Sequence, residues 1–180
     1  MEALIVGLGN PGVEYAWTRH NIGAHIIHAL AEVYGLNMRS EKACEAYIAR
    51  KEINGVVCTL AIPKRYMNES GVCVQKLLKY TKCELRNLLV AIDDVESRWG
   101  VMKLAFDGGA RGHNGLRSIH GIVGSREFTQ CRFGVGHPGK GIVADYVLNK
   151  FEREEMEEMP SLIEKSISMI EEWIITRGKG

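Results

Sequence analysis

Residues suited to acid–base chemistry stand close together near the start of the chain. An apolar run at residues 3–6, typical of a β-strand, leads into a loop that carries Asn10, Tyr15 and His20. Histidine is the side chain whose ordinary pKa suits proton transfer near pH 7, and an asparagine amide both donates and accepts hydrogen bonds. Because loops at the carboxyl ends of strands bind ligands in α/β proteins, this loop is predicted to form part of a site.

The same loop contains the spacing Gly-x-Gly-x-x-Gly at residues 7–12, which also occurs in dinucleotide-binding turns. In such a turn the third glycine opens the first helix, whereas here residues 13–21 intervene without helical periodicity. The acidic residue expected about twenty positions on should end a second strand. Glu32 instead lies inside the helix predicted over residues 22–34. Dinucleotide binding is therefore disfavoured.

Three further loops carry polar residues beside predicted strands or helices. One contains Tyr66 and Asn68 and leads into a helix, and another presents Asp93 and Asp94 at the end of a fully apolar run. The last is a glycine-rich segment that ends near Asn114, at a place where a helix opens. Asn114 could cap that helix or face a substrate. The four loops are predicted to converge on one site.

Composition bounds the class of protein. The chain has 180 residues, 46% of them hydrophobic and 25% charged, and a net charge of +1, which is ordinary for one globular domain over residues 1–180. No apolar run approaches the length of a membrane span. The N-terminus lacks the basic region of a signal peptide and is interpreted as a first strand, so a cytoplasmic protein is expected.

The small net charge hides an asymmetry along the chain. Residues 98–140 contain seven Lys or Arg against two acidic residues, whereas residues 151–172 contain eight Glu against two basic residues. Such a division suggests one face that meets an anion and another that stays solvated. Two ordinary solvated faces are an equal alternative at this point.

The cysteines argue for free thiols. They are odd in number and form no C-x-x-C pair, which favours a reducing compartment and disfavours a structural zinc site. A nucleophilic cysteine would need a histidine beside it, and small buried side chains are the commoner role. The five are Cys44, Cys58, Cys73, Cys83 and Cys131.

The remaining pattern indicates alternating strands and helices. Asn54-Gly55 between two β-rich runs predicts a hairpin, with Pro63 ending its second strand. Strands are predicted over 88–92, 101–106 and 131–136, and helices over 70–80, 116–123, 142–148 and 161–175, the last with Pro160 near its first position. This order predicts an α/β sandwich in which helices flank a twisted, mixed β-sheet.

With these motifs in place, the chain resembles bacterial-type peptidyl-tRNA hydrolases over about residues 4–150. Several motifs in the right order are far more specific together than any one alone. They are Val6-Gly7-Leu8-Gly9-Asn10-Pro11-Gly12, Tyr15 with Thr18-Arg19-His20-Asn21 and Gly23, Met67-Asn68 with Ser70-Gly71, Asp93-Asp94, Gly112-His113-Asn114-Gly115-Leu116 with Ser118-Ile119, and Arg132-Phe133-Gly134-Val135-Gly136-His137-Pro138-Gly139.

The resemblance implies a phosphorylase/hydrolase-like fold and an esterase that frees tRNA from prematurely released peptidyl-tRNA. It implies that His20 takes a proton from water, that Asp93 orients His20, and that Asn10 distinguishes blocked from free amino groups. The further substrate-binding positions implied are Tyr15, Tyr66, Asn68 and Asn114. An activated ester needs a water, a base and oxyanion donors, so neither a metal nor a cofactor is expected. A cytoplasmic monomer with peptidyl-tRNA as partner and no membrane association follows from the same likeness.

Phosphate contacts are expected on the basic stretch, from Lys103, Arg111, Arg117 and Arg132. Two positions in this stretch depart from the pattern of the family. Asp107 stands where relatives tend to have lysine, and Arg111 stands where they tend to have the first glycine of Gly-Gly-His-Asn.

Two other functions remain open at this stage. One is an RNA-binding module that has lost hydrolysis, which the presence of both His20 and Asp93 disfavours. The other is a nucleoside phosphorylase or peptidase of similar architecture, because fold alone does not fix function. The complete set of Asn10, Asn68 and Asn114 beside those two residues argues against it.

Overall fold

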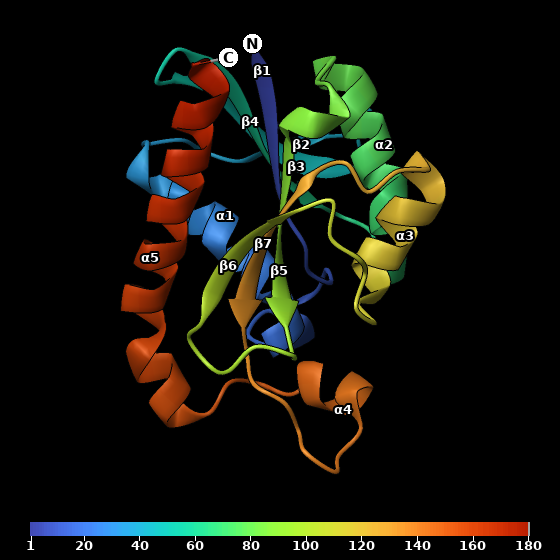
Figure 1. Ribbon diagram of the computed structural model, residues 1–180, viewed down its shortest axis with the longest axis vertical. Coiled ribbons are helices and arrows are strands. Elements are labelled where there is room, and N and C mark those ends of the chain that lie inside the picture. The colour runs from blue at the N-terminus through green and yellow to red at the C-terminus, as the bar shows by residue number, and fades with distance from the viewer. Residues whose placement is uncertain (180) are drawn as a thin grey trace.

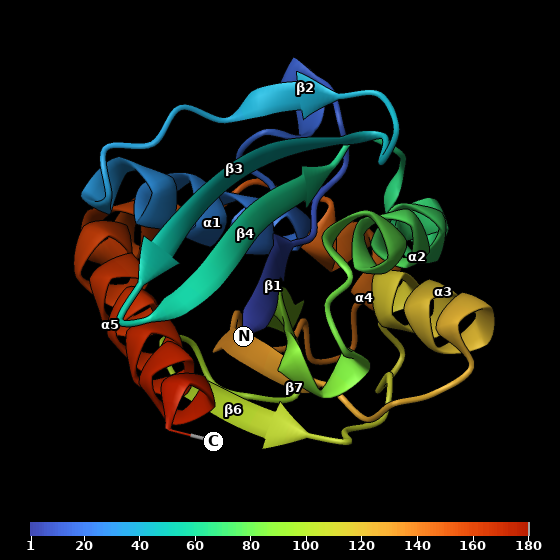
Figure 2. The same cartoon turned by 90° about the horizontal axis from the view of Figure 1, so that it is seen from above.

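The computed structural model describes residues 1–179, which fold around a seven-stranded mixed sheet (Figures 1 and 2). The strand order is β2-β3-β4-β1-β5-β7-β6, in which β4, β1, β5 and β7 are parallel and the remaining pairs antiparallel. The strands are β1 (Glu2–Gly7), β2 (Arg39–Glu41), β3 (Ala46–Ile53), β4 (Val56–Pro63), β5 (Leu88–Asp94), β6 (Met102–Phe106) and β7 (Thr129–Gly134). The predicted fold class is confirmed.

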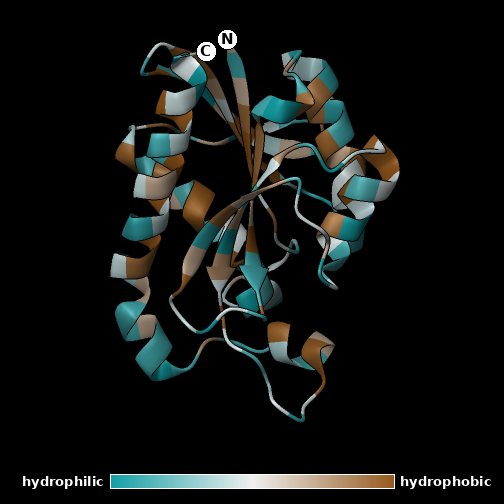
Figure 3. Cartoon of the chain, in the orientation of Figure 1, coloured by the Kyte–Doolittle hydropathy of each residue, from teal (hydrophilic) through white to brown (hydrophobic). Residues whose placement is uncertain are grey.

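Helices cover both faces of the sheet and create two separate apolar cores. On one face α1 and α5 pack through residues such as Ile26 and Ile170, and on the other α2 and α3 pack through Leu77 and Ile119. Figure 3 shows hydrophobic residues along much of the central sheet and a mixture of hydrophobic and hydrophilic residues on the flanking helices. The helices are α1 (Ile22–Val33), α2 (Ser70–Thr81), α3 (Asn114–Val123), α4 (Val143–Val147) and α5 (Arg153–Gly178), with short 3₁₀ turns η1 (Val13–Tyr15), η2 (Arg19–Asn21), η3 (Met67–Glu69) and η4 (Leu85–Asn87). No helix within residues 1–179 is long and apolar enough to cross a bilayer.

Parallel strands bring their carboxyl ends to one edge of the sheet. In Figure 1 the arrowheads of β5 and β7 point toward α4, at the end of the molecule opposite both termini. The loops after β1, β4 and β5 therefore meet at that edge. The segment after β6 returns to it, because His113 at its end contacts Asp93.

The glycines of the first loop serve close packing. A Cβ on Gly7 would lie 2.2 Å from the carbonyl oxygen of Gly23, and one on Gly23 would lie 2.1 Å from that of Ala91. The start of α1 thus rests directly on β1 and β5, which sets the position of His20 immediately before it. This need for close backbone approach explains the Gly-x-Gly spacing without a dinucleotide.

The predicted hairpin is confirmed. Asn54 and Gly55 both have positive φ, 50° and 79°, as a type I′ turn requires. Ile53 pairs with Val56 across the turn, and Pro63 is the last residue of β4.

The predicted start of the last helix at residue 161 is wrong, because α5 begins at Arg153 and Pro160 lies inside it. Glu152 and Glu155 form a capping box at this earlier start, and acidic side chains suit the positive end of a helix dipole. The strand β2 was not predicted. Its three residues pair with β3 from Arg39 to Glu41 and are too few to show a period-2 pattern.

Candidate active site

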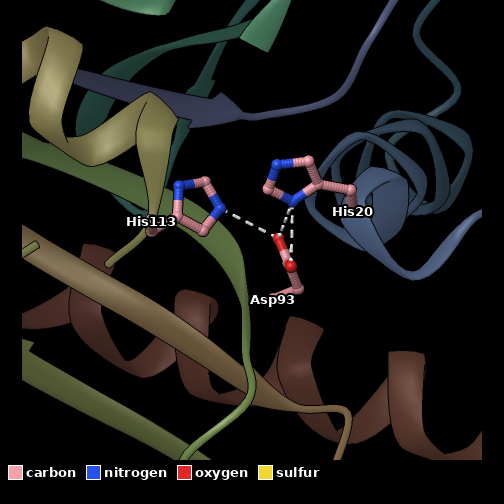
Figure 4. Close-up of side chains that lie close together, drawn as sticks. All are labelled: His20, Asp93 and His113. Atoms are coloured by element: carbon pink, nitrogen blue, oxygen red, sulfur yellow. Dashed lines mark hydrogen bonds and ion pairs between the residues drawn. The ribbon is translucent and has the colours of Figure 1, made fainter. Parts of the chain in front are cut away.

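Three residues from separate elements meet at the carboxyl edge of the sheet (Figure 4). His20 lies in the turn before α1, Asp93 near the end of β5, and His113 immediately before α3. Nδ1 of His20 lies 3.0 and 2.9 Å from the two carboxylate oxygens of Asp93, and Nε2 of His113 lies 2.9 Å from Asp93 Oδ1. All three side chains are buried.

The hydrogen bonds fix the tautomer of each imidazole. Nδ1 of His113 accepts from the backbone N–H groups of Gly115 and Leu116, at 3.1 and 3.3 Å, so its proton is on Nε2 and is donated to Asp93. His20 donates from Nδ1 to the same carboxylate, which leaves its Nε2 as a free lone pair on the opposite edge of the ring. One carboxylate therefore orients the His20 imidazole and is itself held by a second histidine.

The network also sets the proton affinities. Burial alone would lower the pKa of His20, but the charge and hydrogen bond of Asp93 outweigh it and raise the pKa above the ordinary value. Burial opposes ionisation of Asp93, yet the two adjacent imidazoles hold its pKa well below its usual range. Asp93 is thus an anion throughout the physiological range, and its negative charge favours the protonated form of His20.

The same three side chains could in principle hold a metal ion, since their ligand atoms lie within 4.8 Å of one another. Binding would require the proton of His113 to leave Nε2 and move to Nδ1. Nδ1 already accepts two backbone hydrogen bonds, so that change would set an N–H against two N–H donors. The hydrogen-bonding environment favours a proton network over a metal centre.

His20 lies at the junction of two cavities. One, called here the charged cavity, has a volume of about 420 Å³ and includes Asp94, Arg111, Arg117 and Arg132 among its lining residues. The other, called the amide cavity, has a volume of about 570 Å³ and is lined by Asn10, Tyr66, Met67, Asn68, Glu69, Asn114, Ala144, Val147 and Leu148 together with His20. A substrate whose reacting bond lies at His20 can extend into both.

Asn10 is held with one face of its amide turned to the site. Its Oδ1 accepts from the backbone N–H of Met67 at 2.7 Å, and its backbone exchanges two hydrogen bonds with the side chain of Asn21. Because Oδ1 is occupied, Nδ2 is the atom that remains for a ligand in the amide cavity.

The other predicted substrate-binding residues surround the rim of the amide cavity. Asn68 and Asn114 are exposed and line it, as does Tyr66, which is 53% exposed. Tyr15 does not line either cavity but contacts Tyr66 edge to face, with ring centroids 6.3 Å apart. The helix cap is His113 rather than Asn114, which leaves the amide of Asn114 facing the cavity.

The four predicted phosphate-binding residues differ in their solvent exposure and in whether they already pair with other side chains. Arg132 on β7 is only 9% exposed, and its Nε donates to Gln130, so the end of its guanidinium remains toward the charged cavity. Arg111 is paired with Glu96 and lies 3.7 Å from Asp94. Lys103 on β6 pairs in register with Arg132 and is exposed, as is Arg117 on α3. Burial and the nearby Arg111 lower the pKa of Arg132.

All five cysteines are buried and none is in a disulfide, as predicted from their number and spacing. Burial raises the pKa of the Cys131 thiol to about 12, which suppresses its nucleophilic form. In the part of the chain that the structure describes, no cysteine lines either of the two cavities at His20, so none is placed to act as a nucleophile there.

Comparisons with known proteins agree with this geometry. The peptidyl-tRNA hydrolase of Bdellovibrio bacteriovorus is 41% identical over 174 residues, 96% of this chain and 92% of that protein. The crystal structure of the peptidyl-tRNA hydrolase from Acinetobacter baumannii superposes with a TM-score of 0.90 at 36% identity, covering 97% of this chain and 88% of that one. A family model for peptidyl-tRNA hydrolase matches residues 4–179. The chain belongs to the peptidyl-tRNA hydrolase family.

Two residues of this family member's site were not selected from the sequence. His113 was named only as part of the motif around Asn114, and Gln130 was not considered. Gln130 is fully buried, receives Nε–H of Arg132 and donates to the carbonyl oxygens of Gly108 and Gly109. A histidine directly before a helix is a weak capping signal, whereas nothing local marks a buried glutamine on a strand.

Proposed function

We propose that this member of the peptidyl-tRNA hydrolase family hydrolyses the ester that joins a peptide, or an N-blocked aminoacyl group, to the 3′-terminal ribose of tRNA. The observation that carries the proposal is the buried His20–Asp93 pair, which leaves Nε2 of His20 free where the two cavities meet. The charge and hydrogen bond of Asp93 raise the pKa of His20, which strengthens the imidazole as a proton acceptor.

The reaction proceeds by proton transfer and acyl transfer to water. Nε2 of His20 takes a proton as the water oxygen attacks the ester carbonyl carbon. The bond between that carbon and the ribose oxygen then breaks, and the ribose oxygen receives the proton from the imidazolium. Asp93 stabilises the imidazolium while it exists. The products are a free carboxylic acid and tRNA with a free hydroxyl.

The amide cavity supplies neutral donors and acceptors for the acyl side. Asn10 offers Nδ2, and the exposed amides of Asn68 and Asn114 can hold a peptide backbone or the developing oxyanion. These roles require no net charge, which suits a peptide of any sequence. Tyr66, supported by Tyr15, presents an aromatic face at the rim.

The charged cavity is the route of the tRNA backbone in this proposal. Arg132 and Lys103 share a face of the β6–β7 pair, and Arg117 projects from α3 beside the same cavity. Contacts from such residues to phosphates provide affinity without reading sequence. Arg111 takes part less, because Glu96 and Asp94 already neutralise it.

The protein acts as a monomer in the cytoplasm in this proposal. The free buried thiols suit a reducing compartment. Sedimentation at micromolar concentration tests the first statement, and a dimer would contradict it.

Release of an N-acetylated amino acid from charged tRNA tests the function directly. The protein should hydrolyse N-acetyl-aminoacyl-tRNA at least tenfold faster than unblocked aminoacyl-tRNA. The free amino group is charged, whereas Asn10, Asn68 and Asn114 offer neutral amides and the Glu69 carboxylate in the same cavity is already paired with Arg65. Binding of tRNA without release would identify an RNA-binding module. Equal rates on both substrates would remove the proposed role of Asn10.

A further inference from the structure

Arg19, directly before His20, is buried in a position that the proposed reaction does not use. It is 3% exposed, and its Nη2 donates to Glu155 Oε1 at 3.0 Å. Its Nη1 donates to the carbonyl oxygen of Tyr146 at 3.3 Å, and its guanidinium carbon lies 4.1 Å from the centre of the Tyr146 ring. One side chain thus joins the loop of His20 to α4 and to the first turn of α5.

The partners of Arg19 are themselves anchored. Oε1 of Glu155 also accepts from the backbone N–H of Glu152 in the capping box of α5, and the hydroxyl of Tyr146 donates to the carbonyl oxygen of Val135. The backbone N–H of Arg19 donates to the carbonyl oxygen of Asn149. The guanidinium therefore lies at the centre of contacts that hold α4 between two fixed parts of the molecule.

α4 needs such an anchor because it is short and covers the site. It has five residues, of which Val147 alone is buried, and a helix of this length has little stability of its own. Ala144 and Val147 line both cavities beside His20, and Val143 lines the charged cavity. The position of α4 thus sets the width of the space above the base.

We propose that Arg19 is a positioning residue for substrate binding, which holds α4 at a fixed distance from His20 through Tyr146 and Glu155. The proposal rests on the proposed function. We expect Arg19 to affect the affinity for peptidyl-tRNA and not proton transfer, because the side chain of His20 is held by hydrogen bonds to Asp93 and not by Arg19.

The chemistry of arginine explains why this residue stands here. A planar guanidinium can stack on Tyr146 while two of its edges donate to a carboxylate and a carbonyl oxygen, which an ammonium group cannot do. Arg19→Lys keeps the positive charge and loses this geometry. It therefore separates the anchoring of α4 from the general attraction of a cation for RNA.

The experiment compares kcat, KM and the pH profile for N-acetyl-aminoacyl-tRNA hydrolysis in Arg19→Lys and Arg19→Met. Because Arg19→Met leaves Glu155 without its partner, Arg19→Met combined with Glu155→Gln serves as a second variant, in which the glutamine can still accept from Glu152 N–H. Arg153→Met is the matched control, since Arg153 is 90% exposed in the same region. All Arg19 variants should raise KM by about tenfold or more with kcat within about threefold, and with the acid limb of kcat/KM unshifted.

Hydrogen exchange supplies a measurement that does not depend on activity. The amides of Tyr146 and Asn149, which donate to Ile142 and Tyr146, should exchange at least tenfold faster in the Arg19 variants, with α3 unchanged. An unchanged KM with lowered thermal stability would show that Arg19 contributes only to packing. A large loss in kcat with a shifted pH profile would show that Arg19 takes part in proton transfer at His20. Either result overturns the proposal, whereas a wild-type protein without hydrolysis would instead contradict the proposed function.

Discussion

The cluster of His20, Asp93 and His113 and the cations of the charged cavity are held in place in opposite ways. Around Asp93, three buried groups satisfy one another through short hydrogen bonds, and both imidazoles are fixed in one tautomer. In the charged cavity, Arg111 is paired with carboxylates, Arg132 is held by Gln130, and Arg117 is exposed. The first arrangement defines proton positions, and the second defines only a region of positive potential.

This difference separates rate from affinity. Preorganised buried groups act on charge that develops in the transition state, whereas a phosphate contact far from the ester binds ground and transition states alike. Changes near Asp93 should therefore lower kcat, and changes among the cations should alter KM and its dependence on salt.

The largest effect is expected at the base. His20→Ala should lower kcat by roughly 10²–10⁴-fold, the usual contribution of general base catalysis. The dissociation constant for uncharged tRNA should change by less than about twofold, because His20 contacts no proposed phosphate-binding residue. Steady-state kinetics and a filter-binding titration check the two parts. Near-normal hydrolysis in this variant would contradict the proposed mechanism.

Asp93→Asn should reduce kcat by roughly 10²-fold or more, through the tautomer of His20. His113 must donate from Nε2, so it holds the amide oxygen at the Oδ1 position and places the amide nitrogen 2.9 Å from Nδ1 of His20. That N–H then favours His20 with its proton on Nε2, which cannot act as a base.

The role of His113 in this effect can be isolated. Adding His113→Leu to Asp93→Asn should restore part of the lost kcat, because the asparagine amide is then free to turn. The single variant His113→Leu is the control for loss of the helix cap. If the fold-loss in kcat of the double variant equals the product of the two single-variant losses, the two changes act independently. His113 would then not control the orientation of the asparagine amide.

A smaller effect, confined to KM, is expected among the cations. Arg132→Gln should raise KM about tenfold with kcat largely spared, the value of one charge-assisted contact. Arg86→Gln is the control, because Arg86 precedes β5 at the far edge of the sheet and its side chain is 70% exposed. A similar loss in both variants would mean that net charge alone matters. A fall in kcat would show that Arg132 also influences proton transfer at His20.

The smallest effect is expected at Asp107. It lies 3.4 Å from Arg126, and both side chains are about half exposed, so this pair contributes little to stability. Asp107→Lys should lower KM about two- to threefold and steepen the salt dependence, since it adds a cation and releases Arg126. KM at two salt concentrations checks this, and an unchanged value at both would place the RNA path away from the β6–α3 connection.

The sequence was sufficient to predict the features of the fold and site that depend on residues adjacent in the chain. The loop of Asn10 and His20, the buried strand that delivers Asp93, and the Asn54-Gly55 hairpin each follow from a few adjacent residues. Convergence of these loops follows from parallel strands ending at one edge.

What the sequence could not supply depends on contacts between distant segments. His113 meets Asp93 across 20 positions of chain, and Arg19 meets Glu155 across 136. The start of α5 was misplaced because Pro160 resembles a first helical residue, although the capping box at Glu152 provides the earlier start. The burial of Arg132, one of the four cations expected to contact phosphates, is likewise set by its neighbours on the sheet.

The most direct test of the account is the protonation of His20, measured beside the rate. ¹⁵N NMR of the imidazoles and the pH profile of kcat/KM should give one shared pKa above the ordinary 6.5 and a neutral form with its proton on Nδ1. Because only the neutral ring accepts a proton, activity should fall as pH drops through this value. In Asp93→Asn, burial still lowers the pKa of His20 but no carboxylate raises it, so the acid limb of kcat/KM should move to lower pH. A neutral His20 protonated on Nε2, or a limb that does not follow its titration, would contradict the account.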